Sequence, residues 1–126
     1  MSDQKVEKIL YIGTCAGDQA EKAAMPFVMA SAALAMDVQA TICLQGDGVW
    51  LAQKGYAEKM PEPGGFPPVA KLIKEFLELG GKLLVCAPCI KKRNIDEKQD
   101  LLPGSAITAA GALNLEAMES KAVFVY

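Results

Sequence analysis

The sequence has no histidine among its 126 residues and only four cysteines. Structural zinc sites generally use four protein ligands and catalytic sites three, and Cys and His supply most of them. The pair Cys86 and Cys89 has no second Cys-x-x-Cys to complete such a site. A metal would also need Cys15, a carboxylate or another subunit, so we expect neither a metal nor a cofactor.

Phosphate-binding motifs are missing as well. Neither Gly-x-x-x-x-Gly-Lys-Ser/Thr nor Gly-x-Gly-x-x-Gly occurs, so the glycine-bearing segment 13–17 gives no support for nucleotide binding. Positive charge is neither in excess nor widely clustered, because the formal net charge is −2 and the one dense basic run is residues 91–93. Clustered Lys and Arg are what hold nucleic acids and anionic membranes. We therefore expect no direct binding to nucleic acid.

Long hydrophobic runs are also absent. No segment reaches the roughly 18 uninterrupted apolar residues of a membrane-spanning helix. Residues 1–8 are polar and lack the apolar stretch of a secretory signal. These absences predict a cytoplasmic protein without a membrane span. In that reducing compartment we expect reactive thiols, metal ligands or core residues rather than structural disulfides.

What the chain does contain is an apolar content of 52%, enough for one core in a single domain over residues 1–126. Short apolar segments that resemble strands alternate with helical ones. We expect strands at 8–12, 38–44, 82–86 and 121–126. Helices are expected at 21–36, 49–53, 88–92 and 107–118, and from residue 69 to the glycines at 80 and 81. This alternation predicts a three-layer α/β domain with a mainly parallel sheet.

The helix at 21–36 carries two local signals. Asp18 and Glu21 have the Asp-x-x-Glu spacing of a capping box. Pro26 is awkward, because proline past the first turn removes a backbone hydrogen bond and clashes with the preceding turn. The helix is therefore expected to start late or to be kinked near residues 23–25.

Three segments with chemically useful residues each follow a predicted strand. They are the glycine-bearing loops 13–17 and 46–48 and the segment 86–93. Ligands of parallel sheets bind at the carboxyl ends of the strands, so the three segments are expected to share one edge. Cys15 would then lie near Cys86, whereas Cys43, inside a predicted strand, is expected to be an ordinary core residue.

The Cys-x-x-Cys at Cys86 and Cys89 is the most informative motif. Pro88 suits the first turn of a helix, so Cys86 is expected just before a helix N-terminus, where thiolate is favoured and the pKa lowered. Lys92 and Arg93 would add positive charge if their side chains fold back over the loop. A reactive pair, half of a metal site and inert burial all remain open from the motif alone.

These residues also resemble the DsrE-like sulfur-relay family, whose pattern fits nearly the whole chain and most closely residues 82–93. In that family a strand ends in a cysteine that carries persulfide sulfur, followed about seven residues later by an arginine and often a glycine. Cys86 and Arg93 match, and Asn94 replaces the glycine. The resemblance implies a flavodoxin-like three-layer fold, assembly into dimers, trimers or hexamers, and partner proteins that donate and accept sulfur.

The resulting functional hypothesis is a sulfurtransferase-like carrier. Cys86 accepts and passes on persulfide sulfur, Cys89 assists or resolves, and Arg93 with Lys92 steadies the anion. Cys15 is a possible accessory thiol. Two alternatives stay open: a thiol-disulfide oxidoreductase that uses Cys86 and Cys89 as a redox couple, and a non-catalytic subunit of a sulfur-relay assembly.

Overall fold

A computed structural model describes residues 6–126, so the predicted polar segment 1–8 falls mostly outside the described residues. The strands are β1 (Lys8–Gly13), β2 (Gln39–Leu44), β3 (Lys82–Cys86), β4 (Ser105–Thr108) and β5 (Ala122–Val125). The α-helices are α1 (Ala20–Ala35), α2 (Val69–Glu78), α3 (Ala87–Lys92) and α4 (Ala110–Glu119). Three short 3₁₀ helices are η1 (Gly17–Gln19), η2 (Gly46–Ala52) and η3 (Ala57–Lys59).

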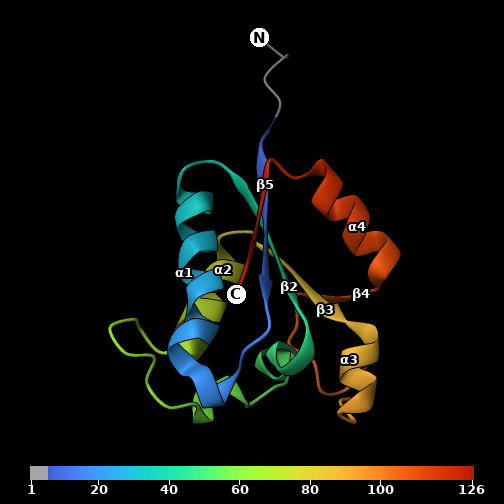
Figure 1. Cartoon of the computed structure of the whole chain (residues 1–126). Helices are drawn as coiled ribbons and strands as arrows, with labels where there is room; N and C mark the ends of the chain where they lie inside the picture. Colours follow the sequence, from blue (N-terminus) through green and yellow to red (C-terminus); the bar gives the residue numbers. More distant parts are fainter. Residues whose placement is uncertain (1–5) are drawn as a thin grey trace.

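The five strands form one parallel sheet in the order β4-β3-β2-β1-β5. The chain moves in one direction from β1 to β4 and then returns to the other side of β1. Because crossovers between parallel strands are right-handed, the return helix covers the opposite face. Helices α1 and α2 accordingly lie on one face and α4 on the other (Figure 1). The predicted three-layer fold is confirmed.

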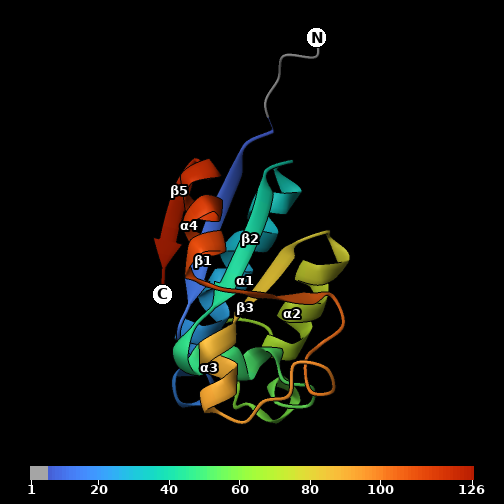
Figure 2. The same cartoon turned by 90° about the vertical axis from the view of Figure 1, so that its right-hand side faces the viewer.

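The two faces of the sheet are packed unequally. The face under α1 and α2 holds the larger core, where Phe27 and Phe76 meet edge to face with ring centroids 5.7 Å apart. The face under α4 holds a small cluster of Leu10, Cys43 and Leu84. Glu116 is the one fully buried residue of α4. Figure 2 shows α4 in front of the sheet, with α3 below it.

The region before α4 corrects the sequence prediction. Residues 107–118 were expected to form one helix, but Ile107 and Thr108 belong to β4 and the helix begins at Ala110. Ala109 is the N-cap residue and makes no side-chain capping bond. The Ala-rich composition favours helix so strongly that a four-residue edge strand left no separate signal.

The beginning of α1 also differs from the prediction. The helix starts at Ala20 rather than late, and Pro26 lies inside it. Asp18 does not form the predicted capping box, because Gln19 is the N-cap residue and no side chain caps the helix. Pro26 is buried against Gly13, where an added Cβ would lie 3.3 Å from its ring. Packing thus outweighs the lost backbone hydrogen bond.

The remaining elements agree with the sequence within about two residues, except that the short helix predicted at 49–53 is the 3₁₀ helix η2, which already starts at Gly46. Helix α2 begins at Val69, as predicted, and Pro68 is its N-cap residue. Between residues 6 and 126, no helix has both the length and the apolar character to span a membrane.

Candidate functional site

The three segments that follow β1, β2 and β3 meet at the carboxyl edge of the sheet, as predicted. The backbone N–H of Gln45 donates to the carbonyl oxygen of Gly13 at 3.0 Å. Gly48 packs so closely on the same carbonyl that a Cβ there would collide with it. The N–H of Gly46 in turn donates to the sulfur of Cys89 at 3.3 Å. The loop after β2 therefore joins the glycine loop to the cysteine pair.

The cysteine pair sits at the junction of β3 and α3. Cys86 ends the strand and is the N-cap residue of the helix, and Pro88 lies in the first turn. Both thiols are reduced and both residues are partly exposed. The predicted position of Cys86 just before a helix is thus confirmed.

The environment of Cys86 does not give the predicted lowering of its pKa. Burial raises the pKa of the Cys86 thiol, and the neighbouring Cys89 side chain raises it further. The nearby Cys89 backbone and the charge of Arg93 lower the pKa without reversing the net change. The expectation from the helix N-terminus was wrong for the resting thiol, because desolvation penalises the anion more than these groups favour it.

Arg93 is held by an acidic side chain from the neighbouring loop. Its guanidinium donates to Asp47 at 2.9 and 3.3 Å and to the carbonyl oxygen of Cys89 at 3.1 Å. Arg93 therefore ties α3 to η2 while its charge still acts on Cys86. Asp47 was missed by the sequence analysis, although its position in the 46–48 loop at the predicted shared edge was a usable signal.

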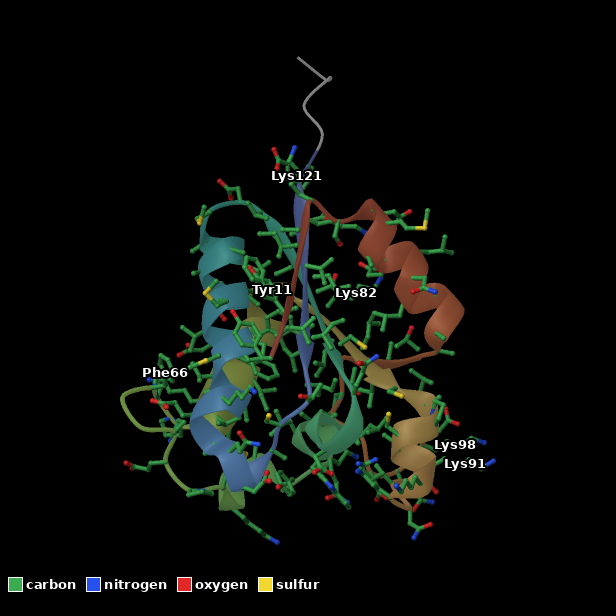
Figure 3. All side chains as sticks on the ribbon, in the orientation of Figure 1. Tyr11, Phe66, Lys82, Lys91, Lys98 and Lys121 are labelled. Carbon is green, nitrogen blue, oxygen red and sulfur yellow. The ribbon has the colours of Figure 1, made fainter. Side chains whose placement is uncertain are left out.

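The two lysines of the basic run are less closely associated with the cysteine pair than Arg93 is. Lys91 points away from the body of the protein at the outer side of α3 (Figure 3). Lys92 is exposed in the last turn of α3, and within residues 6–126 its ammonium group makes no hydrogen bond or ion pair. Of the predicted cations, only Arg93 is fixed beside the cysteine pair.

Cys43, rather than Cys15, is the cysteine that borders the cysteine pair. Cys15 is buried in the larger core, and its only hydrogen bond within the described part of the chain joins it to Thr14 at 3.8 Å. Cys43 is fully buried, and burial together with the nearby Cys86 and Cys89 raises its pKa to about 12. Cys43 is a core residue as predicted, but it also borders the site.

A cavity of about 130 Å³ adjoins Cys86 on the α4 side of the sheet. Its walls come from the ends of β2 and β3 and from the junction of β4 with α4. They consist of Cys43, Gln45, Cys86, Pro88, Thr108, Ala109, Ala110 and Leu113. Over residues 6–126, no group of three or more His, Cys, Asp or Glu side chains is arranged to hold a metal ion.

The fold and the position of the cysteine pair define the class of this protein, which is a parallel α/β domain with two thiols at the carboxyl edge of its sheet. Comparison with known families then identifies the family. A sequence model of the DsrE/DsrF-like family matches residues 7–126. The chain therefore belongs to the DsrE/DsrF-like family, and the resemblance seen in the sequence is confirmed.

Two curated relatives come from Methanocaldococcus jannaschii. The uncharacterized protein MJ0760 is 37% identical over 94 residues, which are 75% of this chain but 34% of that protein. The uncharacterized protein MJ0989 is 30% identical over 106 residues, which are 84% of this chain and 88% of that protein. The chain thus spans only about a third of the length of MJ0760.

Two solved structures share the fold. The YchN protein from E. coli has a TM-score of 0.78 at 16% identity, covering 95% of this chain and 99% of that one. MTH1491 from Methanobacterium thermoautotrophicum, a protein of unknown function, has a TM-score of 0.70 at 14% identity with the same coverage. At these identities the likeness concerns the fold alone.

Proposed function

We propose that this protein carries sulfane sulfur as a persulfide on Cys86. The family to which the chain belongs is known for sulfur relay. The observation that carries the proposal is the position of Cys86, a partly exposed reduced thiol at the junction of β3 and α3. There the charge of Arg93 lies nearby and favours the anion.

The transfer step is a displacement at sulfur. The Cys86 thiolate attacks the terminal sulfur of a donor hydropersulfide R–S–SH, the S–S bond of the donor breaks, and R–S⁻ leaves as Cys86–S–SH forms. No net oxidation occurs, because the sulfane sulfur only changes its carrier. Delivery to an acceptor thiol is the same step in reverse, with the acceptor thiolate as the nucleophile.

Cys89 assists as the second thiol of the pair. Its side chain lies close enough to Cys86 to raise the pKa of that thiol. The N–H of Gly46 donates a hydrogen bond to the Cys89 sulfur at 3.3 Å, which holds this side chain beside the loop after β2. Arg93, with the exposed Lys92 as a weaker second charge, steadies the anion formed when sulfur is handed on.

Loading with a sulfane donor tests the proposal. Purified protein incubated with inorganic polysulfide, freed of excess reagent and measured by intact mass spectrometry is expected to carry one added sulfur. Cys89→Ser is expected to load more slowly but still to load. A wild-type protein that gains no sulfur under these conditions contradicts the carrier function.

A thiol-disulfide oxidoreductase is the second candidate, favoured by the two reduced thiols of Cys86 and Cys89 at one β3–α3 junction. Such an enzyme cycles through a Cys86–Cys89 disulfide and needs both sulfurs. If the protein is an oxidoreductase, Cys89→Ser should abolish turnover of a disulfide substrate. If it is a sulfur carrier, Cys89→Ser should only slow sulfur loading. A Cys89→Ser variant that neither turns over a disulfide nor loads sulfur favours the oxidoreductase.

The remaining expectations concern the surroundings of the carrier. We infer a cytoplasmic protein that self-associates as a dimer, trimer or hexamer and docks donor and acceptor proteins at the Cys86 edge. Sedimentation equilibrium tests the self-association. A raised pKa of the Cys86 thiol does not distinguish a non-catalytic subunit from a sulfur carrier, because burial raises this pKa in both cases. A protein that gains no sulfur from polysulfide is identified as the non-catalytic subunit.

A further inference from the structure

The cavity beside Cys86 is bordered by two thiols from neighbouring strands. Cys43 of β2 is paired with Leu84 of β3, and Cys86 lies two residues further along β3. Side chains alternate between the faces of a sheet, so Cys43 and Cys86 lie on the same face, the one under α4. Both thiols line the cavity.

These two thiols are too far apart to form a disulfide with each other. Strands about 4.8 Å apart and a rise of about 3.3 Å per residue put their Cα atoms roughly 8 Å apart across the diagonal. Disulfides span Cα separations of about 4.4–6.8 Å. Cys43 is therefore a wall of the space next to Cys86 and not a second resolving thiol.

The size and lining of the cavity restrict what it can hold. Its volume of about 130 Å³ is slightly less than the roughly 150 Å³ of an apolar cavity that holds benzene. One or two sulfur atoms fit, whereas a peptide-sized donor does not. Six of the eight lining residues are Cys, Pro, Ala or Leu. An ionic donor such as thiosulfate would lose its hydration there without gaining a charged partner among the lining residues.

The first turn of α4 forms the outer wall of the cavity. Ala110 lines it with a small side chain, and Leu113 follows one turn later. The helix is fixed further along by Glu116, which accepts hydrogen bonds from Lys8, Lys82 and Thr41. The wall is thus held in place from a point outside the cavity.

We propose that this cavity receives the terminal sulfur of the persulfide on Cys86 in its uncharged –S–SH form and shields it from solvent. The inference rests on the proposed carrier function. It adds that the cargo is a neutral sulfane sulfur, taken from inorganic polysulfide or from a protein persulfide, and that its length is limited by Cys43 and Ala110.

Filling the cavity tests this inference. Ala110→Leu enlarges a residue that lines the cavity, whereas Ala112→Leu makes the same change on a residue of α4 that does not line it. Both alanines are exposed, so the two variants differ only in their position relative to the cavity. Both variants and the wild type are loaded with inorganic polysulfide. Cyanide is then added, which takes the terminal sulfur as thiocyanate and restores the Cys86 thiol. The rate of thiocyanate release is measured.

Ala110→Leu is expected either to load less or to lose its sulfur about tenfold faster than the wild type, which equals about 1.4 kcal/mol in the barrier. Ala112→Leu is expected to behave as the wild type. Equal loading and equal release in all three proteins overturn the cavity inference but leave the carrier function intact. A wild type that carries no sulfur overturns both.

A second variant keeps the test informative if Ala110→Leu does not fold, as judged by circular dichroism. Cys43→Ala enlarges the cavity from its inner wall. It is expected to accept a longer chain, seen by intact mass as a second added sulfur in part of the molecules. A mass distribution identical to that of the wild type contradicts the role of Cys43 in limiting the cargo.

Discussion

The two edges of the sheet both gather polar side chains, but they use them differently. At the amino edge, Glu116 is buried and accepts hydrogen bonds from Lys8 at 3.2 Å, Lys82 at 3.0 Å and Thr41 at 3.0 Å. Figure 3 shows Lys82 between the sheet and α4. At the carboxyl edge, Cys86 and Cys89 remain reduced and partly exposed beside the Asp47–Arg93 pair.

The difference shows which cluster is available for chemistry. Both oxygens of Glu116 are occupied by partners within the chain, and these partners join α4 to β1, β2 and β3. That cluster explains how a sparsely packed helix stays on the sheet. At the other edge, the Cys89 sulfur accepts one hydrogen bond from Gly46, and a cavity opens beside Cys86. The carrier function proposed above therefore involves the carboxyl edge, whereas the amino edge contributes to stability.

The largest expected effect is at Cys86. Cys86→Ser is expected to abolish sulfur loading, because a hydroxyl cannot carry persulfide sulfur. Cys15→Ser serves as the control, since Cys15 lies in the larger core away from the cavity. Intact mass after polysulfide treatment measures both. Full loading of Cys86→Ser would show that another thiol is the carrier.

The amino edge should respond in stability instead. Glu116→Gln removes the charge that pairs with Lys8 and Lys82, and we expect a loss of about 2 kcal/mol in the free energy of unfolding. Glu119→Gln is the matched control, because among residues 6–126 the Glu119 carboxylate pairs with Lys8 alone and its side chain is 66% exposed. Its expected cost is below about 0.5 kcal/mol. Urea denaturation distinguishes the two, and equal losses would contradict the structural role of Glu116.

Stability should also depend on acid through the same residue. Burial alone would raise the pKa of Glu116, but hydrogen bonds from Lys82, Lys8 and Thr41 lower it below 4.5. A lowered pKa means that the stabilisation is present above pH 4.5 and is lost as the pH falls through the folded-state value. The urea midpoint should therefore fall on acidification, and Glu116→Gln should flatten this decline. An unchanged slope in the variant would assign the decline to other carboxylates.

The smallest expected effect concerns the charge beside the cysteine pair. Arg93 lowers the pKa of Cys86, so Arg93→Gln should slow alkylation of Cys86 by iodoacetamide at a fixed neutral pH. The factor should stay below about tenfold, because a partly exposed charge contributes ~1 kcal/mol or less. Lys92→Gln is the control and should change the rate less. A larger effect of Lys92→Gln would reverse the assignment of the two cations.

Much of the fold could be predicted because its signals are local. Strands β1, β2 and β3 are short apolar runs closed by glycine or by the cysteine motif, and α2 shows a clear helical period. The strand β4 was not predicted, because four residues beside an Ala-rich helix carry little periodicity. The capping box at Asp18 failed because a spacing rule does not say where packing starts the helix.

The site was predicted in part for a similar reason. The shared edge followed from strand direction, which the sequence indicates, and it brought the 46–48 loop to Cys86. The wall formed by Cys43 depends on the register between β2 and β3, which no single strand specifies. The pKa of Cys86 was predicted in the wrong direction because the motif shows the helix start but not the burial that opposes it.

The most direct measurement is the position of the added sulfur. Wild-type protein loaded with polysulfide is alkylated, digested and analysed by peptide mass spectrometry, which separates a persulfide on Cys86 from one on Cys89 within the same peptide by fragmentation. We expect the additional sulfur on Cys86. Finding it on Cys89 alone, or on neither cysteine, would contradict the proposal that Cys86 carries the persulfide.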